Sequence, residues 1–300
     1  MTCRTFNNIE KNNSFFQCVQ LVDDALAECK CKYAMLKGAY LCKAYLEGYR
    51  TSNDIDLLVH PDDVTEIGNE LLKLGFKQGN IRNGNFEPAT RKEIIESKMT
   101  RGETVPYIKE VNLPGMRFLE VDINFSLDYK PGDTELLKEM MSNSVVLKLG
   151  EYKVHTLRND DFFVHLCSHL YKETTTLPWV EMMRDMTLYK YCDIYMLLND
   201  ADDEQVDFLF DRAEELGMEK ICAFAVLHTA ELFKFRNRHA VEVAEKTLGN
   251  DRNFIHRVIS PTDKKEFIFR DRSVIKRFFA DNRKELLEEV KVDESIKYET

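Results

Sequence analysis

The chain has 300 residues, of which 44% are hydrophobic and 31% are charged, and its formal net charge is -10. This length suits two domains, and the composition is that of a globular protein with enough apolar residues for a core. The negative charge disfavours a nucleic-acid partner, because polynucleotide binding depends on Lys and Arg side chains placed against phosphates. No apolar run approaches the roughly 18 residues of a membrane helix, and the N-terminus is polar, so we expect no membrane association.

The eight cysteines are scattered along the chain and contain no C-x-x-C pair. Most of them lie in apolar helical patterns. This usage is typical of reduced thiols in a cytoplasmic protein, and we expect no disulfides.

In chain order, the first half is predicted to alternate helices and strands. A helix over 14–31, with Ser14 as its N-cap, leads into a strand over 32–36, and Lys37-Gly38-Ala39 then turns into a helix over 40–47. The later predicted elements are a strand over 54–59, a helix from Asp62 or Asp63 to Leu74, a strand near 76–78, a turn-rich stretch over 80–85, a helix over 89–99, strands over 104–111 and 116–127, a helix over 134–141, and a hairpin of 144–149 and 152–157.

From about Gly132 the pattern changes, and after the hairpin it is helical. We therefore place a domain boundary at residue 157, with an all-α domain over 158–300. Its helices are predicted over 160–171, 203–216, 220–235, 240–248 and 272–290, and the charged tail from Lys291 is expected to fray.

Two acids open an apolar strand: Asp54-Ile55-Asp56 is followed by Leu57-Leu58-Val59. Side chains alternate along a strand, so Asp54 and Asp56 share a face and repel each other. A cation between them would stabilise this arrangement, and carboxylate oxygens suit Mg²⁺ or Mn²⁺ better than zinc. Glu120 and Asp122 recur in the same way on a second apolar strand. The alternative is that such acids form the solvated face of an edge or antiparallel strand.

Three segments together carry a family resemblance: K-G-A at 37–39, R-T-S-N-D-I-D-L-L-V at 50–59, and E-V-D-I-N-F-S-L at 120–127. They resemble the nucleotidyltransferase superfamily that shares the palm-like fold of polymerase β, and in particular a poorly characterised group of bacterial nucleotidyltransferases. The resemblance implies an α+β fold, with a mixed sheet and helices in a nucleotidyltransferase domain over 1–157. It also implies that Asp54 and Asp56 bind metal, that Asp122 is a third metal-binding and catalytic carboxylate, and that Gly38 marks a phosphate-binding turn.

The implied reaction transfers a nucleoside monophosphate from a nucleoside triphosphate such as ATP to the hydroxyl or phosphate of a small acceptor, and releases pyrophosphate. Two metal ions would serve the attacking and leaving oxygens. Asp122 is the candidate general base. The candidate nucleotide-binding residues are Gly38, Lys37, Arg50 and Ser52. The alternatives are that Arg50 forms an ion pair with a loop acid and that Lys37 is a solvated surface cation.

Histidines four residues apart, His165 and His169, share a face of the predicted helix over 160–171. This is zinc-ligand spacing, but without the glutamate of H-E-x-x-H, so a pair lining a core or cleft is the competing interpretation. In the resembling family a His near this position and an Asp on the next helix match His169 and Asp193. The two would hydrogen-bond each other and support the floor of a cleft.

Two alternative functions remain open. In one, the protein is a regulatory protein that binds nucleotide without turnover, which is favoured by Ala39 in place of the usual serine and by Asn124 in place of a histidine. In the other, it attaches a nucleotide to a protein or tRNA, as toxin-type relatives do, and the acidic charge weakens this option. The acceptor, the nucleotide and the oligomeric state do not follow from the sequence.

Overall fold

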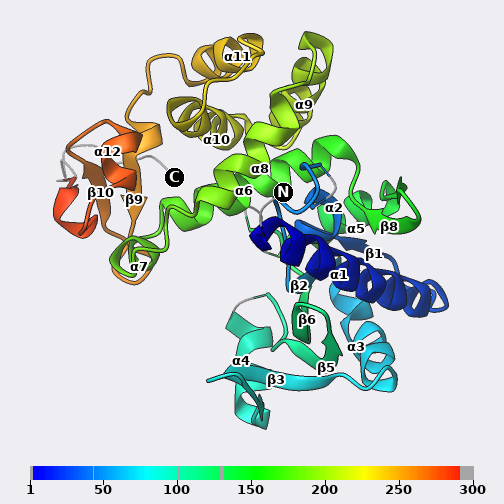
Figure 1. The fold of residues 1–300 in the computed structure, drawn as a ribbon. Helices are drawn as coiled ribbons and strands as arrows, with labels where there is room; N and C mark the ends of the chain where they lie inside the picture. The colour runs from blue at the N-terminus through cyan, green and yellow to red at the C-terminus, as the bar shows by residue number, and fades with distance from the viewer. Residues whose placement is uncertain (1–2, 43, 101, 129–131, 291–300) are drawn as a thin grey trace. The chain divides into compact units, whose positions relative to one another are not determined.

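A computed structural model of the chain describes residues 3–42, 44–100, 102–128 and 132–290. By its internal contacts the chain divides into two compact units, Met1–Phe162 and Phe163–Thr300 (Figure 1). The boundary predicted at residue 157 lies just before helix α6 (Asn159–Thr174). None of the helices in the described ranges is both long enough and apolar enough to cross a membrane.

The first unit is built on a six-stranded mixed sheet with the strand order β1-β2-β6-β5-β3-β4. β2 and β6 pair in parallel, whereas the other neighbouring strands are antiparallel. This mixed sheet confirms the predicted α+β fold class. The strands are β1 (Tyr33–Met35), β2 (Asp54–Val59), β3 (Lys77–Arg82), β4 (Asn85–Pro88), β5 (Tyr107–Leu113) and β6 (Met116–Asn124).

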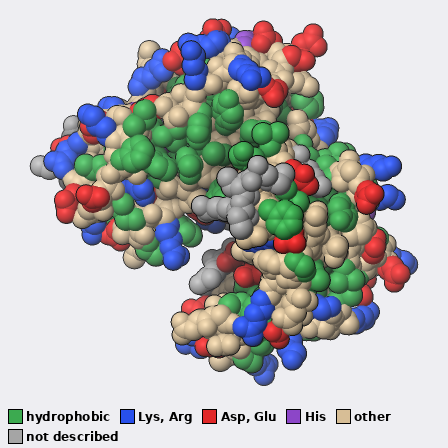
Figure 2. All heavy atoms as spheres, viewed as in Figure 1, with side chains coloured by type: hydrophobic (Ala, Val, Ile, Leu, Met, Phe, Trp, Pro, Cys, Tyr) green, Lys and Arg blue, Asp and Glu red, His purple; other side chains and the backbone are tan. Residues whose placement is uncertain are grey.

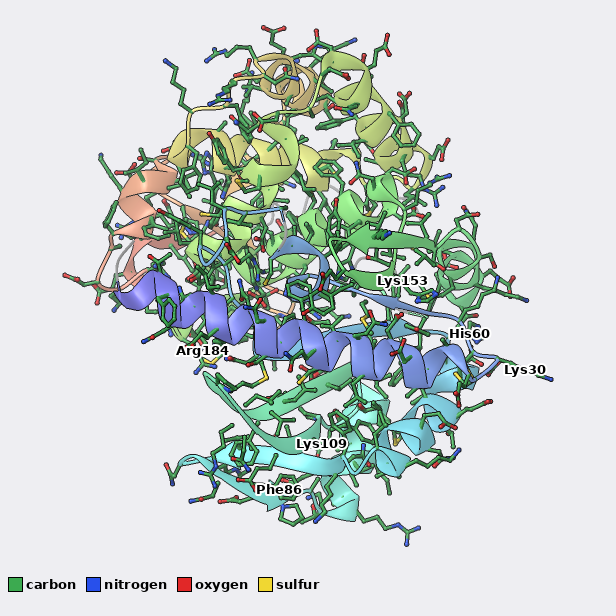
Figure 3. The ribbon with its side chains drawn as sticks, turned by 45° about the vertical axis from the view of Figure 1, so that its right-hand side comes forward. Lys30, His60, Phe86, Lys109, Lys153 and Arg184 are labelled. Atoms are coloured by element: carbon green, nitrogen blue, oxygen red, sulfur yellow. The ribbon has the colours of Figure 1, made fainter. Side chains whose placement is uncertain are left out.

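Helices α1 (Cys3–Ala27) and α3 (Val64–Lys73) pack on the sheet through one apolar face. Figure 3 shows α1 running along the sheet, with Lys30 just beyond its C-terminal end. Ile55 and Leu57 of β2 lie in this core and are fully buried, because alternate residues of the strand point toward the helices. The remaining elements of the unit are α2 (Gly38–Leu41), the 3₁₀ turn η1 (Pro61–Asp63), α4 (Arg91–Thr100), α5 (Thr134–Ser142), and a hairpin of β7 (Val145–Leu149) and β8 (Tyr152–Thr156).

A polar cluster of three side chains joins α1, β1 and β8. Tyr33 donates its hydroxyl to Asp23 Oδ1 at 2.8 Å, and His155 Nδ1 lies 2.7 Å from the same oxygen. Asp23 and Tyr33 are buried. Because β1 leads directly into the Lys37-Gly38 turn, this cluster fixes the strand that positions that turn.

Three predictions for the first unit are wrong in detail. α1 begins at Cys3, and Ser14 is no N-cap but donates to the carbonyl of Pro114. The early turns of α1 are anchored by Asn8 and Asn12, whose side chains donate to the carbonyls of Gly48 and Arg50, and such long-range contacts are invisible in a sequence.

The second error is a helix that is predicted too long, and the third is a hairpin that is predicted as a turn-rich stretch. The helix predicted over 40–47 ends at Leu41, which is buried, whereas Leu46 farther along the segment is 75% exposed. The stretch over 80–85 is a hairpin instead of a loop. Asn83 and Gly84 have φ of 51° and 75°, the left-handed pair that a tight two-residue hairpin turn needs.

The second unit is mainly helical, as predicted, but it is not all-α. It contains a three-stranded antiparallel sheet with the order β11-β10-β9, and one of these strands, β11 (Leu287–Glu289), lies in the region predicted as a helix over 272–290. The elements after α6 are α7 (Leu177–Glu181), α8 (Leu188–Leu198), α9 (Asp203–Glu215), α10 (Glu219–Leu232), α11 (His239–Leu248), η2 (Phe254–His256), β9 (Arg257–Ile259), β10 (Glu266–Phe269), α12 (Val274–Phe278), η3 (Lys284–Leu286) and β11 (Leu287–Glu289).

An arginine side chain caps the C-terminal end of α12 (Val274–Phe278). Arg283 Nε donates to the carbonyl of Arg277 at 3.0 Å, and its Nη2 donates to the carbonyl of Phe278 at 3.1 Å. These carbonyls lie in the last turn of the helix, and that of Arg277 also accepts from the amide of Ala280 at 3.3 Å. The chain can therefore turn away toward β11 without leaving polar groups unsatisfied.

Arg283 belongs to a buried ion cluster around Asp185, which is fully buried. Arg283 Nη1 lies 2.7 Å from Asp185 Oδ1, and Arg277 Nη2 lies 2.9 Å from Asp185 Oδ2. Arg277 also stacks on Phe269 of β10, with its guanidinium carbon 3.8 Å from the ring centre. Through these ion pairs the Asp185 carboxylate connects α12 and the segment before β11 to the helical part of the unit.

We expect Asp185→Asn to lower the free energy of unfolding by about 3 kcal/mol or more, because it leaves two buried guanidinium groups without their charge partner. Chemical denaturation monitored by circular dichroism measures this change. Asp271→Asn is the matched control, since Asp271 pairs with Lys276 on the exposed surface, and its unfolding midpoint should stay near that of the unmodified protein. Equal, small effects of the two substitutions would contradict a stabilising role for the buried cluster.

Candidate active site

Four carboxylates lie on one face of the parallel β2-β6 pair. The register places Asp54 opposite Glu120 and Asp56 opposite Asp122. Residues paired in this way project on the same side of a sheet, and residues two apart on a strand do so too. Ile55 and the other residues that alternate with these acids along the two strands point to the opposite, apolar face. The register therefore brings Asp54, Asp56 and Asp122 together, and it adds Glu120.

This face carries more acidic than basic side chains. Burial, followed by the charges of Asp56, Glu120 and Asp54, raises the pKa of Asp122 to about 8. Burial and then Asp54 and Asp56 raise the pKa of Glu120. Negative charges at close range oppose further ionisation, so the cluster would be stabilised by a cation.

Lys37 supplies one positive charge to this face. Its Nζ lies 2.7 Å from Asp56 Oδ1, and the Asp56 side chain is only 8% exposed. Burial lowers the pKa of Lys37, but Asp56, Asp54 and Asp128 outweigh that effect and raise it, so the ammonium stays charged. Lys37 also has a φ of 43°, a backbone conformation that residues with a side chain rarely adopt.

Gly38 and Ser52 meet beside Asp54. Ser52 Oγ donates to Asp54 Oδ1 at 2.7 Å. A Cβ atom at position 38 would lie 2.3 Å from Ser52 Oγ and 2.5 Å from Ser52 Cβ, so only glycine fits against this serine. Ser52 thus places a hydroxyl beside the turn, whereas Ala39 stands where related proteins usually have a serine. The helix that follows Gly38 is a single turn, so its dipole contributes little to anion binding.

Arg50 is a buried side chain in the loop before β2. Its Nη1 donates to the carbonyl of Thr51 at 3.4 Å and lies 3.9 Å from Cys42 Sγ. Its own carbonyl accepts from Asn12 of α1. These contacts hold the loop in place, and the suggested contact of Arg50 with nucleotide stays a prediction.

In the second unit, His169 of α6 lies between two charged side chains. Its Nε2 is 3.4 Å from Glu173 Oε1 and 3.2 Å from Lys190 Nζ, and Lys190 also pairs with Glu173. The ring of His169 stacks parallel to that of His165, with centres 6.3 Å apart. Asp193 is buried on α8. The expected contact between His169 and Asp193 stays a prediction.

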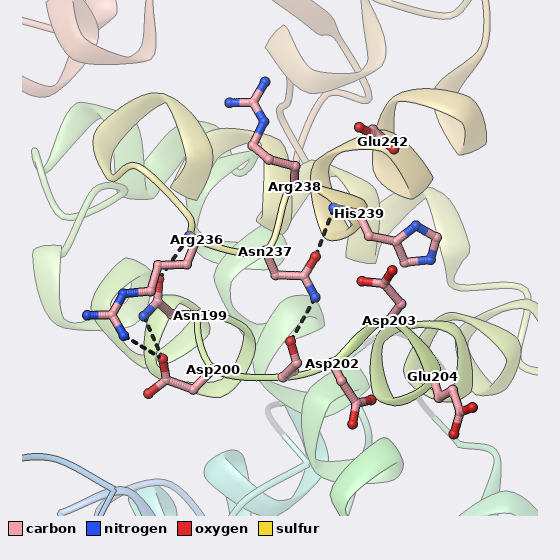
Figure 4. A pocket seen from close by; sticks show the side chains of 11 residues that line it. Asn199, Asp200, Asp202, Asp203, Glu204, Arg236, Asn237, Arg238, His239 and Glu242 are labelled. Atoms are coloured by element: carbon pink, nitrogen blue, oxygen red, sulfur yellow. Dashed lines mark hydrogen bonds and ion pairs between the residues drawn. The ribbon is translucent and has the colours of Figure 1, made fainter.

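A polar hollow of about 1020 Å³ lies wholly within the second unit, between the α8–α9 and α10–α11 connections (Figure 4). Its lining is held together by hydrogen bonds from Arg236 to Asn199 and Asp200 and from Asn237 to Ala201. None of the predicted site residues lines it. On the face drawn in Figure 2, acidic and basic side chains are interspersed, so that face carries no continuous basic surface.

The donor set on the β2-β6 face fits a divalent cation chemically. Carboxylate oxygens are the preferred ligands of Mg²⁺ and Mn²⁺, and the raised pKa of Asp122 marks a local deficit of positive charge. Among the described residues, however, no three His, Cys, Asp or Glu side chains are already gathered as the ligands of one ion. Asp54 and Asp56 instead bond to Ser52 and Lys37.

Comparison with known proteins gives the family. The sequence matches the family described as "Uncharacterised nucleotidyltransferase" over residues 1–234. The chain belongs to this family. It is accordingly a transferase, and the predicted resemblance to nucleotidyltransferases is confirmed.

Two solved structures are similar to parts of this chain. One is an antigenic nucleotidyltransferase-like protein from Paracoccidioides brasiliensis, with 14% identity and a TM-score of 0.41, covering 70% of this chain and 93% of that one. The other is the antibiotic-resistance factor ANT(2'')-Ia, with 11% identity and a TM-score of 0.40, covering 69% of this chain and 96% of that one. No curated protein matches the sequence.

Glu120, Glu173 and Lys190 were not among the site residues predicted from the sequence. The alternation along residues 116–127 placed Glu120 on the face of Asp122, but an antiparallel strand with a solvated face would read the same way. Glu173 follows His169 by four residues, a helical contact spacing that could have identified it. Lys190 lies on a different helix, so no local pattern indicates its contact with His169.

The high pKa of Asp122 makes the metal-free protein less stable as pH rises. Between its ordinary value of 3.8 and about 8, the folded carboxyl keeps a proton that the unfolded chain has lost, so stability falls across this window. Asp122→Asn should flatten that part of the dependence and raise the melting temperature at pH 8. Thermal melts in EDTA from pH 4 to pH 9 measure both effects. A variant that is less stable than the unmodified protein at pH 8 would contradict the raised pKa.

Proposed function

We propose that the protein transfers a nucleoside monophosphate from a nucleoside triphosphate to a hydroxyl or phosphate oxygen of a small acceptor and releases pyrophosphate. The observation that carries this proposal is the parallel register that sets Asp56 opposite Asp122 and Asp54 opposite Glu120, in a chain of the nucleotidyltransferase family. Four carboxylates on one face suit the binding of divalent cations, and such cations neutralise the negative charge of a triphosphate.

Asp54, Asp56 and Asp122 are the residues that would hold Mg²⁺ or Mn²⁺. When bound, the cation supplies charge neutralisation for the triphosphate and the leaving pyrophosphate and lowers the pKa of the attacking hydroxyl. Ser52 orients Asp54 through its 2.7 Å hydrogen bond. The close contact between Gly38 and Ser52 keeps the turn against the β2 end of this face.

The reaction forms one bond and breaks one. An acceptor oxygen attacks the α-phosphorus, the bond from that phosphorus to the β-phosphate oxygen breaks, and pyrophosphate leaves with the bonding electron pair. Asp122 takes the proton of an acceptor hydroxyl. Burial, followed by the neighbouring acids, raises the pKa of Asp122 in the metal-free protein, and a bound cation would favour the ionised carboxylate, which is the form that can accept this proton.

The net charge of -10 supports a small acceptor over a polynucleotide. The nucleotide-binding residues in this proposal are Lys37, Gly38 and Ser52, with Arg50 in a loop-holding role beside them. ATP is the first nucleotide to test.

Asp56→Asn should lower Mg²⁺-dependent pyrophosphate release by more than about 100-fold, because even the outer partners of a metal site contribute about 10- to 100-fold. The measurement is pyrophosphate release from each of the four nucleoside triphosphates, with pools of sugars, aminoglycosides and cell extract as acceptors. Asp62→Asn is the control, since the Asp62 side chain is 89% exposed and pairs only with His60 among the ion pairs described for it. Full activity of Asp56→Asn would remove Asp56 from the site. Nucleotide binding with no turnover on any acceptor would favour the regulatory alternative.

A further inference from the structure

Lys37 holds a position that a metal ion would also need. Its ammonium donates to Asp56 Oδ1 at 2.7 Å, and the Asp56 side chain is only 8% exposed. A divalent cation that binds Asp56 must compete with the ammonium for the same carboxylate. Two cations side by side also repel each other strongly in a partly buried site.

The backbone dihedral angles of Lys37 favour glycine, and this indicates that the lysine side chain has a function of its own. The residue has φ 43° and ψ -109°, values that glycine adopts readily and other residues adopt only at a cost. The carbonyl of Lys37 accepts from the amides of Tyr40 and Leu41, so the first turn of α2 holds this backbone in place. If the turn alone mattered, glycine would serve better at this position. A lysine here adds a charge on a flexible four-carbon stem.

We propose that Lys37 is an internal counter-ion, which neutralises Asp56 in the absence of metal and is displaced when a divalent cation binds. The freed ammonium then reaches a phosphate oxygen of the triphosphate. This inference rests on the proposed function, and it adds an order of events: metal binding prepares the nucleotide site by releasing its lysine. Lys37 is thus the residue that couples the two ligands.

The first test follows the reactivity of Lys37 in the unmodified protein. Reductive methylation with isotope-labelled formaldehyde, read by peptide mass spectrometry, reports how available each lysine amine is. Mn²⁺ alone should increase methylation of Lys37, and further addition of a non-hydrolysable triphosphate should decrease it again. Lys73 is the internal reference, because it pairs with Glu70 on the surface and is 70% exposed. Its methylation should not change.

The second test removes the charge. Lys37→Met keeps an unbranched apolar stem and should bind Mn²⁺ about tenfold more tightly than the unmodified protein when no nucleotide is present. With Mn²⁺ bound, the same variant should bind the triphosphate more weakly. Lys37→Arg keeps the charge and should stay close to the unmodified protein in Mn²⁺ affinity. Calorimetry with Mn²⁺ and then with nucleotide measures both constants.

Saturable Mn²⁺ binding with no change in Lys37 methylation would overturn the inference and leave the proposed reaction standing. The absence of any Mn²⁺ binding would overturn both. The predicted pattern of methylation without pyrophosphate release would support the counter-ion and contradict the transfer reaction. If Lys37→Met does not fold, the methylation experiment still decides, because it uses the unmodified chain.

Discussion

The parallel pairing of β2 with β6 is the constraint on which the rest of the first unit depends. Two strands of opposite polarity would also alternate acid and apolar side chains, but the parallel register sets Asp54 beside Glu120 and Asp56 beside Asp122. The opposite face of the same strands is apolar and packs against α1 and α3. A shift of one residue would bury the acids in the core, so the hydrophobic face fixes the position of every carboxylate.

Repulsion among these carboxylates must be offset. Lys37 does so in part, through its ion pair with Asp56, while burial and then the neighbouring acids raise the pKa of Asp122 and of Glu120. A protein selected only for stability would place apolar or neutral side chains on such strands. The acid face therefore reads as a functional feature, and the proposed role in binding a cation and a triphosphate accounts for it.

Much of this site could be predicted from the sequence, because it follows from local rules. Strand alternation predicts that Asp54 and Asp56 share a face, and the apolar runs predict which strands are buried. The parallel register between β2 and β6 could not be obtained in this way, since it depends on contacts between segments more than sixty residues apart. The same limit explains why Lys37 was considered only as a ligand of nucleotide and its ion pair with Asp56 was not foreseen.

The second unit shows where local patterns mislead. The periodicity over 272–290 favours a helix, but Arg277 and Arg283 are drawn to the buried Asp185, and the chain forms a short helix, a 3₁₀ turn and a strand instead. A long-range ion cluster leaves no mark on hydrophobic spacing. Similarly, Asn83-Gly84 was recognised as a turn signal, but the strands on either side are polar and short, so their alternation is too weak to predict a hairpin.

The most direct test of the central claim is the position of a metal ion in a crystal grown with Mn²⁺ and a non-hydrolysable nucleoside triphosphate. The account predicts an anomalous scattering peak within about 2.0–2.6 Å of carboxylate oxygens of Asp54, Asp56 and Asp122, the range of hard-cation ligand distances. The same map should contain a triphosphate oxygen in contact with the ion. A bound nucleotide with its metal held by other residues, or with no metal on the β2-β6 face, would contradict the account.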